Sequence, residues 1–148
     1  MAEVLYTIDI LRLAASTGDW PPLIQPDASA ERRSPTCGSR VRVDVACAPD
    51  GRVAAVGVQV GACALGQAAT AIMAAQAPGR SLEDFRMVRD GLAAYLKGER
   101  EALPDWPGMA PLAPARAYPA RHASILLAFD ATLAALDSAA RQPGRAHG

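Results

Sequence analysis

The 148-residue sequence has few aromatic residues, few cysteines and no net charge. It contains only two Trp, three Tyr and two Phe, so its core must be built mainly from the Ala, Val and Leu within its 51% hydrophobic content. That content is too high for a disordered chain, and the length is that of one ordinary domain. We therefore expect a single domain over residues 1–148, with a frayed tail at 141–148.

The absence of a charge excess and of long apolar runs excludes several classes of protein. Fifteen basic residues match fifteen acidic ones, whereas a nucleic-acid binder needs a basic excess for phosphate contacts. No run approaches the roughly 18 apolar residues of a membrane-spanning helix. We expect no secretory signal at Met1–Val4, because no basic segment precedes a long apolar stretch there. We expect a cytoplasmic protein without a membrane or nucleic-acid partner, in which three cysteines do not indicate a disulfide framework.

Two segments alternate apolar and polar residues with the period of a half-buried strand. They cover residues 39–47 and 53–61, and Asp50-Gly51 between them favours a two-residue type I′ hairpin turn. With that turn the apolar faces coincide, which predicts the facing pairs Val41–Val60, Val43–Val58 and Val45–Val56. Residues 28–33 are predicted to form a third strand at the edge of the sheet.

Four further segments have helical spacing. They are residues 4–16, about 63–76, a segment that Ser81 caps and that ends near Gly98, and about 124–140. The buried face of the first is predicted to consist of Leu5, Ile8, Leu11 and Ala15. Residues 99–120 contain five prolines and should be irregular. The pattern predicts an α+β domain, with a small antiparallel sheet of about three strands packed against helices on one face.

The hairpin register also brings two cysteines to the open end of the hairpin. Extended beyond the strands, it sets Cys37 opposite Ala64 and Gly38 opposite Cys63, with facing Cα atoms roughly 4.5–5.5 Å apart. Strict alternation would point the two thiols to opposite faces, but Gly38 and Gly61 can bend the chain there. Cys63 also begins a helix, and a helix N-terminus favours a reactive, metal-binding thiolate. Each cysteine alone could be a small buried residue, but together they indicate a shared thiol site.

Other candidate residues have simpler interpretations. Cys47 continues the valine face of its strand, which favours a place in the core. The arginines at 32, 33, 40 and 42 form a basic stretch near Cys37, and we interpret it as a solvated face because acidic residues dilute it. Arg116 and Arg121 are interpreted as surface residues that could also meet a partner. His122 could be a solvated loop histidine just ahead of the last helix, which Ser124 would cap.

Four motifs follow one another in the chain: Ser34-Pro35-Thr36-Cys37-Gly38-Ser39, Asp50-Gly51-Arg52-Val53, Gly61-Ala62-Cys63-Ala64 and the segment Tyr118–Leu127. Their order resembles that of the IscU/SufU/NifU N-terminal family of iron–sulfur cluster assembly scaffolds. They are similar to its first-cysteine loop, its hairpin turn, its second-cysteine helix start and the segment around its third cysteine. The resemblance implies the family's fold and a cysteine desulfurase as sulfur donor.

The sequence departs from the family pattern at two positions. The family's third cysteine falls at Ala123, and the aspartate of its usual Cys-Gly-Asp loop falls at Ser39. His122 occupies a position where IscU-type members often carry a histidine. The resemblance therefore implies Cys37, Cys63 and His122 as metal ligands, Cys37 and Cys63 as candidate sulfur acceptors, and Ser39 and Arg121 as neighbours of the site.

Counting ligands limits what this set can hold. A structural zinc site takes four ligands and an all-cysteine cluster takes four thiolates, whereas the chain has three cysteines. What remains is a three-ligand site with an open position, a cluster shared between subunits, or no metal.

Four functional hypotheses remain open. The first is a scaffold-like protein that binds iron, zinc or a transient iron–sulfur cluster and is not itself an enzyme. The others are a metal-free interaction or regulatory module of the same machinery, a SufU-like zinc-dependent sulfur-transfer protein, and a protein with a reversible Cys37–Cys63 disulfide.

Overall fold

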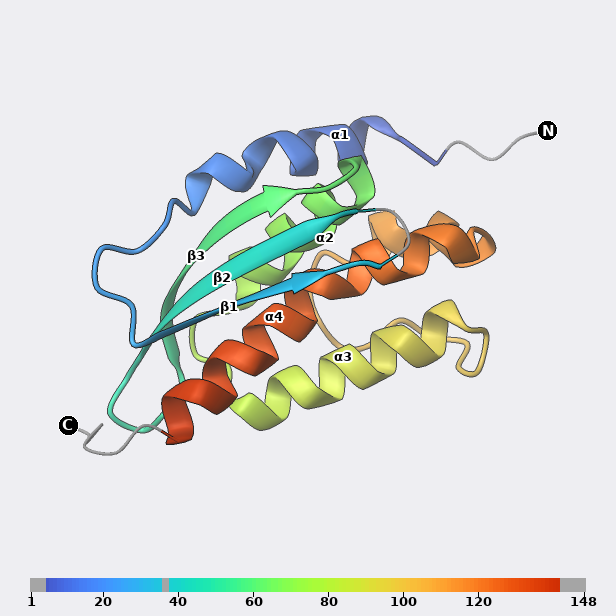
Figure 1. The fold of residues 1–148 in the computed structure, drawn as a ribbon. Coiled ribbons are helices and arrows are strands. Elements are labelled where there is room, and N and C mark those ends of the chain that lie inside the picture. The colour runs from blue at the N-terminus through green and yellow to red at the C-terminus, as the bar shows by residue number, and fades with distance from the viewer. Residues whose placement is uncertain (1–4, 36–37, 142–148) are drawn as a thin grey trace.

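The computed structural model describes residues 5–35 and 38–141 (Figure 1). In these ranges the chain forms, in order, α1 (Ile8–Ala15), η1 (Ser16–Asp19), β1 (Ala28–Arg33), β2 (Arg40–Cys47), β3 (Val53–Gly61), α2 (Ala64–Gln76), α3 (Leu82–Leu96), η2 (Ala110–Ala117), η3 (Pro119–Arg121) and α4 (His122–Arg141). The η elements are 3₁₀ helices, and two of them fall in the proline-rich segment that was expected to be irregular. The predicted tail beyond Arg141 lies outside the described residues.

The three strands form one antiparallel sheet in the order β1-β2-β3. The predicted edge strand at 28–33 and all three predicted valine pairs are confirmed. Burial of the valines fixes this register, because a shift by one residue would turn the whole apolar face of β2 and β3 toward solvent.

The hairpin turn differs from the prediction. Cys47 pairs with Val53 across an irregularity in the ladder, and Gly51 N–H donates to the Ala48 carbonyl (2.8 Å). Gly51 has a φ of +88°, but no residue other than glycine has a positive φ in the described part of the chain. A type I′ turn needs a positive φ at both central residues, so Asp50-Gly51 does not form one. The longer connection ends in a left-handed glycine, the arrangement of a three-residue hairpin loop.

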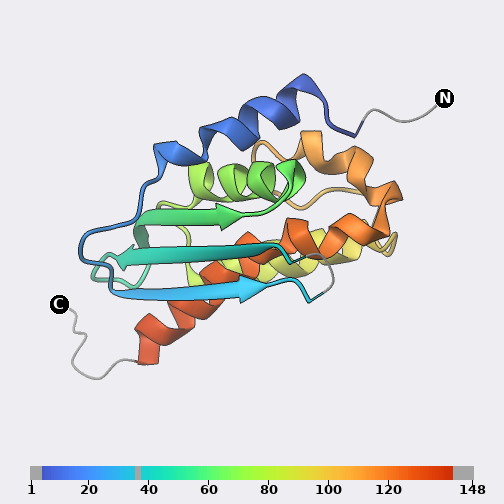
Figure 2. The same ribbon diagram turned by 45° about the horizontal axis from the view of Figure 1, so that its top comes forward.

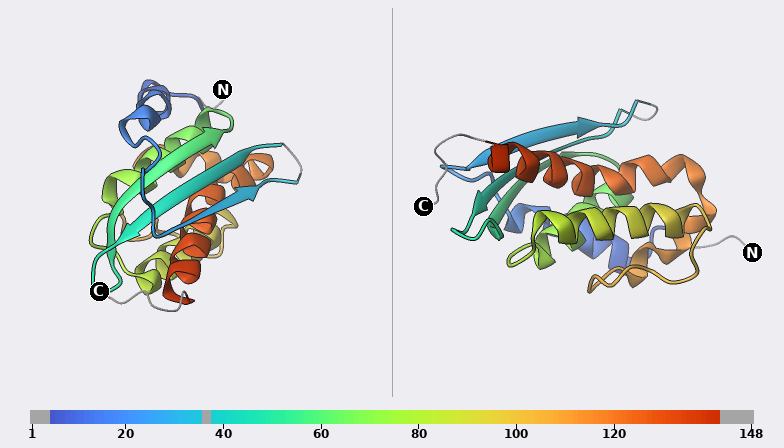
Figure 3. Two further views of the ribbon diagram at one scale, coloured as in Figure 1. Left: turned by 60° about the vertical axis from the view of Figure 1, so that its left-hand side comes forward. Right: turned by 90° about the horizontal axis from the view of Figure 1, so that it is seen from below.

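The helices cover one face of the sheet, which confirms the predicted α+β class (Figures 2 and 3). α4 packs across β1 and β2, and α2 packs against β3 and α4. α1 lies on α2, and α3 lies on the side of α4 away from the sheet. The core between these layers is made of small and branched side chains around Phe85, Trp106 and Phe129, whose rings meet edge to face.

The buried face of α1 is not the predicted one. Ile10 and Ala14 are buried against the fold, whereas Ile8 and Leu11 are 67% and 51% exposed. Both pairs have helical spacing, so periodicity alone could not choose between them. The choice depends on where α2 lies, which the local sequence does not contain.

The outer face of the sheet is partly covered by the segment that follows η1. Val58 N–H donates to the Trp20 carbonyl (2.9 Å), and a Cβ on Gly57 would lie 2.4 Å from the Pro21 carbonyl oxygen. Asp44 is buried beneath this crossing, where it accepts hydrogen bonds from Leu23 N–H (3.1 Å) and from the Ser29 hydroxyl (2.6 Å). Asp44 therefore anchors the crossing segment to the sheet.

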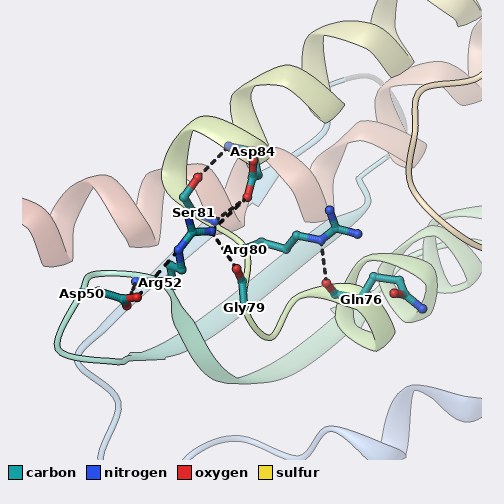
Figure 4. A network of polar contacts seen from close by, with 7 residues as sticks. All are labelled: Asp50, Arg52, Gln76, Gly79, Arg80, Ser81 and Asp84. Carbon is teal, nitrogen blue, oxygen red and sulfur yellow. Dashed lines mark hydrogen bonds and ion pairs between the residues drawn. The ribbon is translucent and has the colours of Figure 1, made fainter.

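A polar network joins the hairpin turn to the connection between α2 and α3 (Figure 4). Arg52 donates to the Gly79 carbonyl (3.0 Å) and lies 3.6 Å from the Asp84 carboxylate. Ser81 and Asp84 form the reciprocal capping box of α3, which confirms Ser81 as its N-cap. The network fixes the start of α3 at the end of the sheet where the hairpin turns.

Among the residues that the structure describes, one segment, Pro119–Arg141, is apolar and long enough to cross a membrane by length and composition alone, although it contains no unbroken apolar run of that length. In the fold, 56% of its apolar window is buried. Its apolar side chains pack against the sheet, α2 and α3, so the position of α4 in the core accounts for its composition.

Candidate functional site

Three segments that are distant in the sequence meet where β3 ends and α2 begins. Cys63 is the N-cap residue of α2, and its side chain makes no capping hydrogen bond. Its sulfur lies 3.5 Å from the hydroxyl oxygen of Ser124, in the first turn of α4. The Ser124 hydroxyl in turn lies 3.1 Å from that of Ser39, which immediately precedes β2. These two contacts connect the thiol of Cys63 to the hydroxyl of Ser124 and, through it, to that of Ser39.

The close approach of α2 and α4 depends on Gly66. A Cβ on this residue would lie 2.8 Å from both the Ser124 hydroxyl oxygen and the Ala62 side chain, and 3.3 Å from the Ser124 carbonyl oxygen. Cβ atoms in proteins essentially never lie closer than 3.0 Å to such atoms. Glycine at this position therefore lets the first turn of α4 approach Cys63.

The loop between β1 and β2 holds Ser39 in place. Ser34 N–H donates to the Ser39 carbonyl (2.8 Å), and Gly38 N–H donates to the Ser34 carbonyl (3.2 Å). Gly38 has a φ of +75°, a left-handed conformation that glycine adopts without strain. The loop thereby turns Ser39 into the fold, where it is 5% exposed.

The sequence prediction for the two cysteines is only partly tested. The β2–β3 ladder ends at the Arg40–Gly61 pair, so Gly38 and Cys63 are not strand partners and the extended register was wrong there. Cys63 leaves the strand to begin α2, as expected. Cys37 lies outside the described residues. Its partnership with Cys63, as metal ligand or in a disulfide, stays a prediction.

His122 and Ser124 lie differently from the prediction. α4 begins at His122, so this histidine is not in a loop ahead of the helix, and Ser124 is a buried residue of the first turn and not a cap. The Nε2 atom of His122 lies 3.0 Å from the Ala115 carbonyl oxygen. A carbonyl can only accept, so this contact places a proton on Nε2. In the neutral ring, Nδ1 then carries the lone pair that could bind a metal.

The other candidate residues lie either next to this site or away from it. Arg121 ends η3, directly before His122, and is half-buried. Ala123, where the resemblance puts the third cysteine, is exposed. Cys47 is half-buried at the hairpin end of β2, where its N–H donates to Asp27 (2.6 Å) and its side chain packs against the core. This position agrees with its interpretation as a packing residue.

Ligands of the carboxylate type are missing from the segments that build the site. Residues 32–43, 51–82 and 106–129 contain neither Asp nor Glu, although the chain has fifteen such residues. Within residues 5–35 and 38–141, no group of three or more His, Cys, Asp or Glu side chains could hold a metal ion. In the described part of the site, the Cys63 sulfur is in contact with the Ser124 hydroxyl, which is itself bonded to Ser39.

Sequence reasoning did not identify Ser124 as a neighbour of Cys63. Its place beside Ala123 was the available signal, because a residue next to a position expected to carry a ligand lies near that site. The contact itself depends on how α4 packs against α2.

Comparison with solved structures identifies the fold and the family. The N-terminal part of a nitrogen-fixing NifU-like protein from Brucella abortus is 35% identical, with a TM-score of 0.86; the match covers 93% of this chain and 96% of that one. The chain belongs to the NifU-like N-terminal family. This confirms the family resemblance that the cysteine motifs suggested.

Other structures share the fold of this NifU-like chain at lower identity. A protein named as an iron–sulfur cluster assembly scaffold for the SUF system, from the thermophile Fervidobacterium islandicum, is 18% identical with a TM-score of 0.74; the match covers 89% of this chain and 96% of that one. A protein described only as hypothetical is 19% identical with a TM-score of 0.63, over 86% of this chain and 96% of that one. No protein-family model and no curated protein matches the sequence of this chain.

Proposed function

We propose that this NifU-like domain is a scaffold for iron–sulfur cluster assembly, which binds iron, zinc or a transient cluster and receives sulfur from a cysteine desulfurase. The observation that carries the proposal is the chain of contacts from Cys63 through Ser124 to Ser39. It unites the three segments that resemble the family's cysteine motifs. Family membership at 35% identity supports the same role.

The proposed ligands are Cys37, Cys63 and His122. Thiolate and imidazole are the ligands that zinc and iron–sulfur clusters use. The Ala115 carbonyl would orient the imidazole by accepting its Nε2 proton, a common arrangement for metal-binding histidines. Three ligands leave one position open, which suits a cargo that is loaded and released more than a permanent structural metal.

The proposed sulfur transfer needs only a thiolate and a donor persulfide. The Cys63 sulfur attacks the terminal sulfur of a Cys–S–SH group on the desulfurase, and a new S–S bond forms as the old one breaks. The donor cysteine leaves as a thiolate, and Cys63 carries the persulfide. Cys37 is the second candidate acceptor. We further propose that the chain acts in the cytoplasm as a single domain, without nucleic acid.

Intact-mass analysis after incubation with a cysteine desulfurase and free cysteine tests this proposal. The wild type should gain the mass of at least one sulfur atom, and the gain should fall in Cys63→Ser and vanish in the double variant with Cys37→Ser. Cys47→Ser is the matched control, because Cys47 lies at the other end of β2, and it should behave as wild type. A wild type that gains no sulfur would contradict the proposal.

A metal-free module of the same machinery is the second candidate. Ser39 and Ala123 favour it, because they stand where the resemblance puts an aspartate and a cysteine. Such a module would bind the desulfurase as tightly after Cys37→Ser and Cys63→Ser as before, whereas a scaffold would lose its cargo in these variants.

A further inference from the structure

The two hydroxyls beside Cys63 are almost completely removed from solvent. Ser124 is 2% and Ser39 is 5% exposed. A buried hydroxyl that lacks a partner costs folding free energy, so native proteins pair such groups. Here the Ser124 oxygen is shared between the Ser39 hydroxyl at 3.1 Å and the Cys63 sulfur at 3.5 Å. Ser124 therefore connects the buried Ser39 hydroxyl to the half-buried thiol of Cys63.

We propose that Ser124 is a positioning residue, which donates a hydrogen bond to the Cys63 sulfur when that sulfur carries cargo. The inference rests on the proposed function. A hydroxyl has one hydrogen and two acceptor positions. With a protonated thiol, Cys63 can donate to Ser124, which donates to Ser39. A sulfur bonded to a metal or to a second sulfur atom has no hydrogen, so the contact then requires Ser124 to donate to it.

Ser39 allows the hydrogen bond between the two buried serines to reverse its direction. When Ser124 turns its hydrogen to the sulfur, its oxygen keeps both acceptor positions, and a hydroxyl such as that of Ser39 can donate to one of them. The contact between the two serines persists in both directions. An ionised carboxylate in the place of Ser39 could only accept, so it could not support Ser124 in this way.

The hydrogen bond would act on the sulfur directly. Hydrogen bonds to cysteine sulfur tune iron–sulfur centres, and groups that orient a ligand influence its metal affinity. Arg40, which lies over Gly61, is the cation of β2 nearest in register to Cys63. Its side chain is exposed, whereas Ser124 is held in place by its burial in α4.

Cobalt binding to the purified apoprotein tests this role, because Co²⁺ bound to a thiolate absorbs through sulfur-to-metal charge transfer. Ser124→Ala should weaken Co²⁺ binding about tenfold and shift the charge-transfer band, and Ser39→Ala should shift it in the same direction by less. Ser138→Ala is the matched control, because Ser138 is exposed on the same helix, and it should leave both unchanged. A purely structural role for Ser124 would not move the band.

The outcomes separate this inference from the proposed function. A wild-type band that is lost in Cys63→Ser but keeps its energy and affinity in Ser124→Ala would overturn the role of Ser124 alone. A wild type without such a band, or a band that survives Cys63→Ser, would overturn metal binding at Cys63 and the role of Ser124 with it.

Discussion

Gly66 and Ser124 form the contact at which α2 and α4 come together beside Cys63. A Cβ on Gly66 would stand 2.8 Å from the Ser124 hydroxyl oxygen. The positions of the thiol and the hydroxyl thus depend on the absence of a side chain at Gly66, in the first turn of α2.

Gly66→Ala should therefore destabilise the protein, although alanine is the better helix former by about 1 kcal/mol. The added methyl group would force α4 away from α2, and overpacking of this kind costs roughly 1–3 kcal/mol. Urea unfolding measures the change. Gly18→Ala is the control, because a Cβ there meets nothing within 4 Å. A Gly66→Ala protein as stable as wild type would show that the contact can relax.

Ala123→Cys should strengthen metal binding. The resemblance places the family's third cysteine here, and the exposed side chain next to Ser124 has room for a thiol. A further thiolate would occupy the open position of the proposed site. Competition with a chromophoric zinc chelator should show at least a tenfold higher zinc affinity for Ala123→Cys than for wild type. Ala120→Cys, at an exposed position on η3, should show no gain in zinc affinity. Equal affinity in both variants would place position 123 outside the site.

Asp44→Ala should loosen the segment that crosses the outer face of the sheet. It removes the acceptor for Leu23 N–H and for the Ser29 hydroxyl. Hydrogen bonds to a charged group contribute about 1.5–3 kcal/mol, a loss that urea unfolding would detect. Asp90→Ala is the control, since that carboxylate is 77% exposed. A loss no larger than that of Asp90→Ala would mean that the crossing segment does not depend on Asp44.

Asp84 should make the stability of the fold depend on pH. The Ser81 backbone N–H lowers the pKa of this carboxyl most; with the Ser81 hydroxyl, Arg52 and Arg80 it outweighs partial desolvation, which raises it. The stabilisation from a lowered pKa is present above the ordinary value of 3.8 and is lost as the pH falls through the folded-state value. Asp84→Asn should thus unfold at lower urea than wild type at pH 7, and the difference should shrink in acid. A difference that is constant with pH would contradict this origin.

The sequence predicts the parts of the fold that follow from local periodicity. Alternating valines give the β2–β3 register, and Ser81 with Asp84 gives the start of α3, because both patterns are satisfied by neighbouring residues. The prediction of the buried face of α1 was wrong, because α2, against which α1 packs, is distant in the sequence.

In the candidate site, too, some features follow from the local sequence and others depend on packing. Cys63 at the start of α2 follows from the sequence, whereas its contact with Ser124 depends on the packing of two helices. Local alternation also could not reveal that the ladder stops at Arg40 and Gly61, where the chain turns toward α2.

The most direct test of the scaffold proposal is the metal and acid-labile sulfide content of the anaerobically purified protein. Wild type and Cys47→Ser should carry iron or zinc, and Cys63→Ser should lose it. Sulfide that accompanies iron in wild type and Cys47→Ser, but not in Cys63→Ser, would indicate a bound cluster. Metal that is retained in Cys63→Ser, or absent from all three proteins after incubation with iron and sulfide, would contradict a scaffold role centred on Cys63.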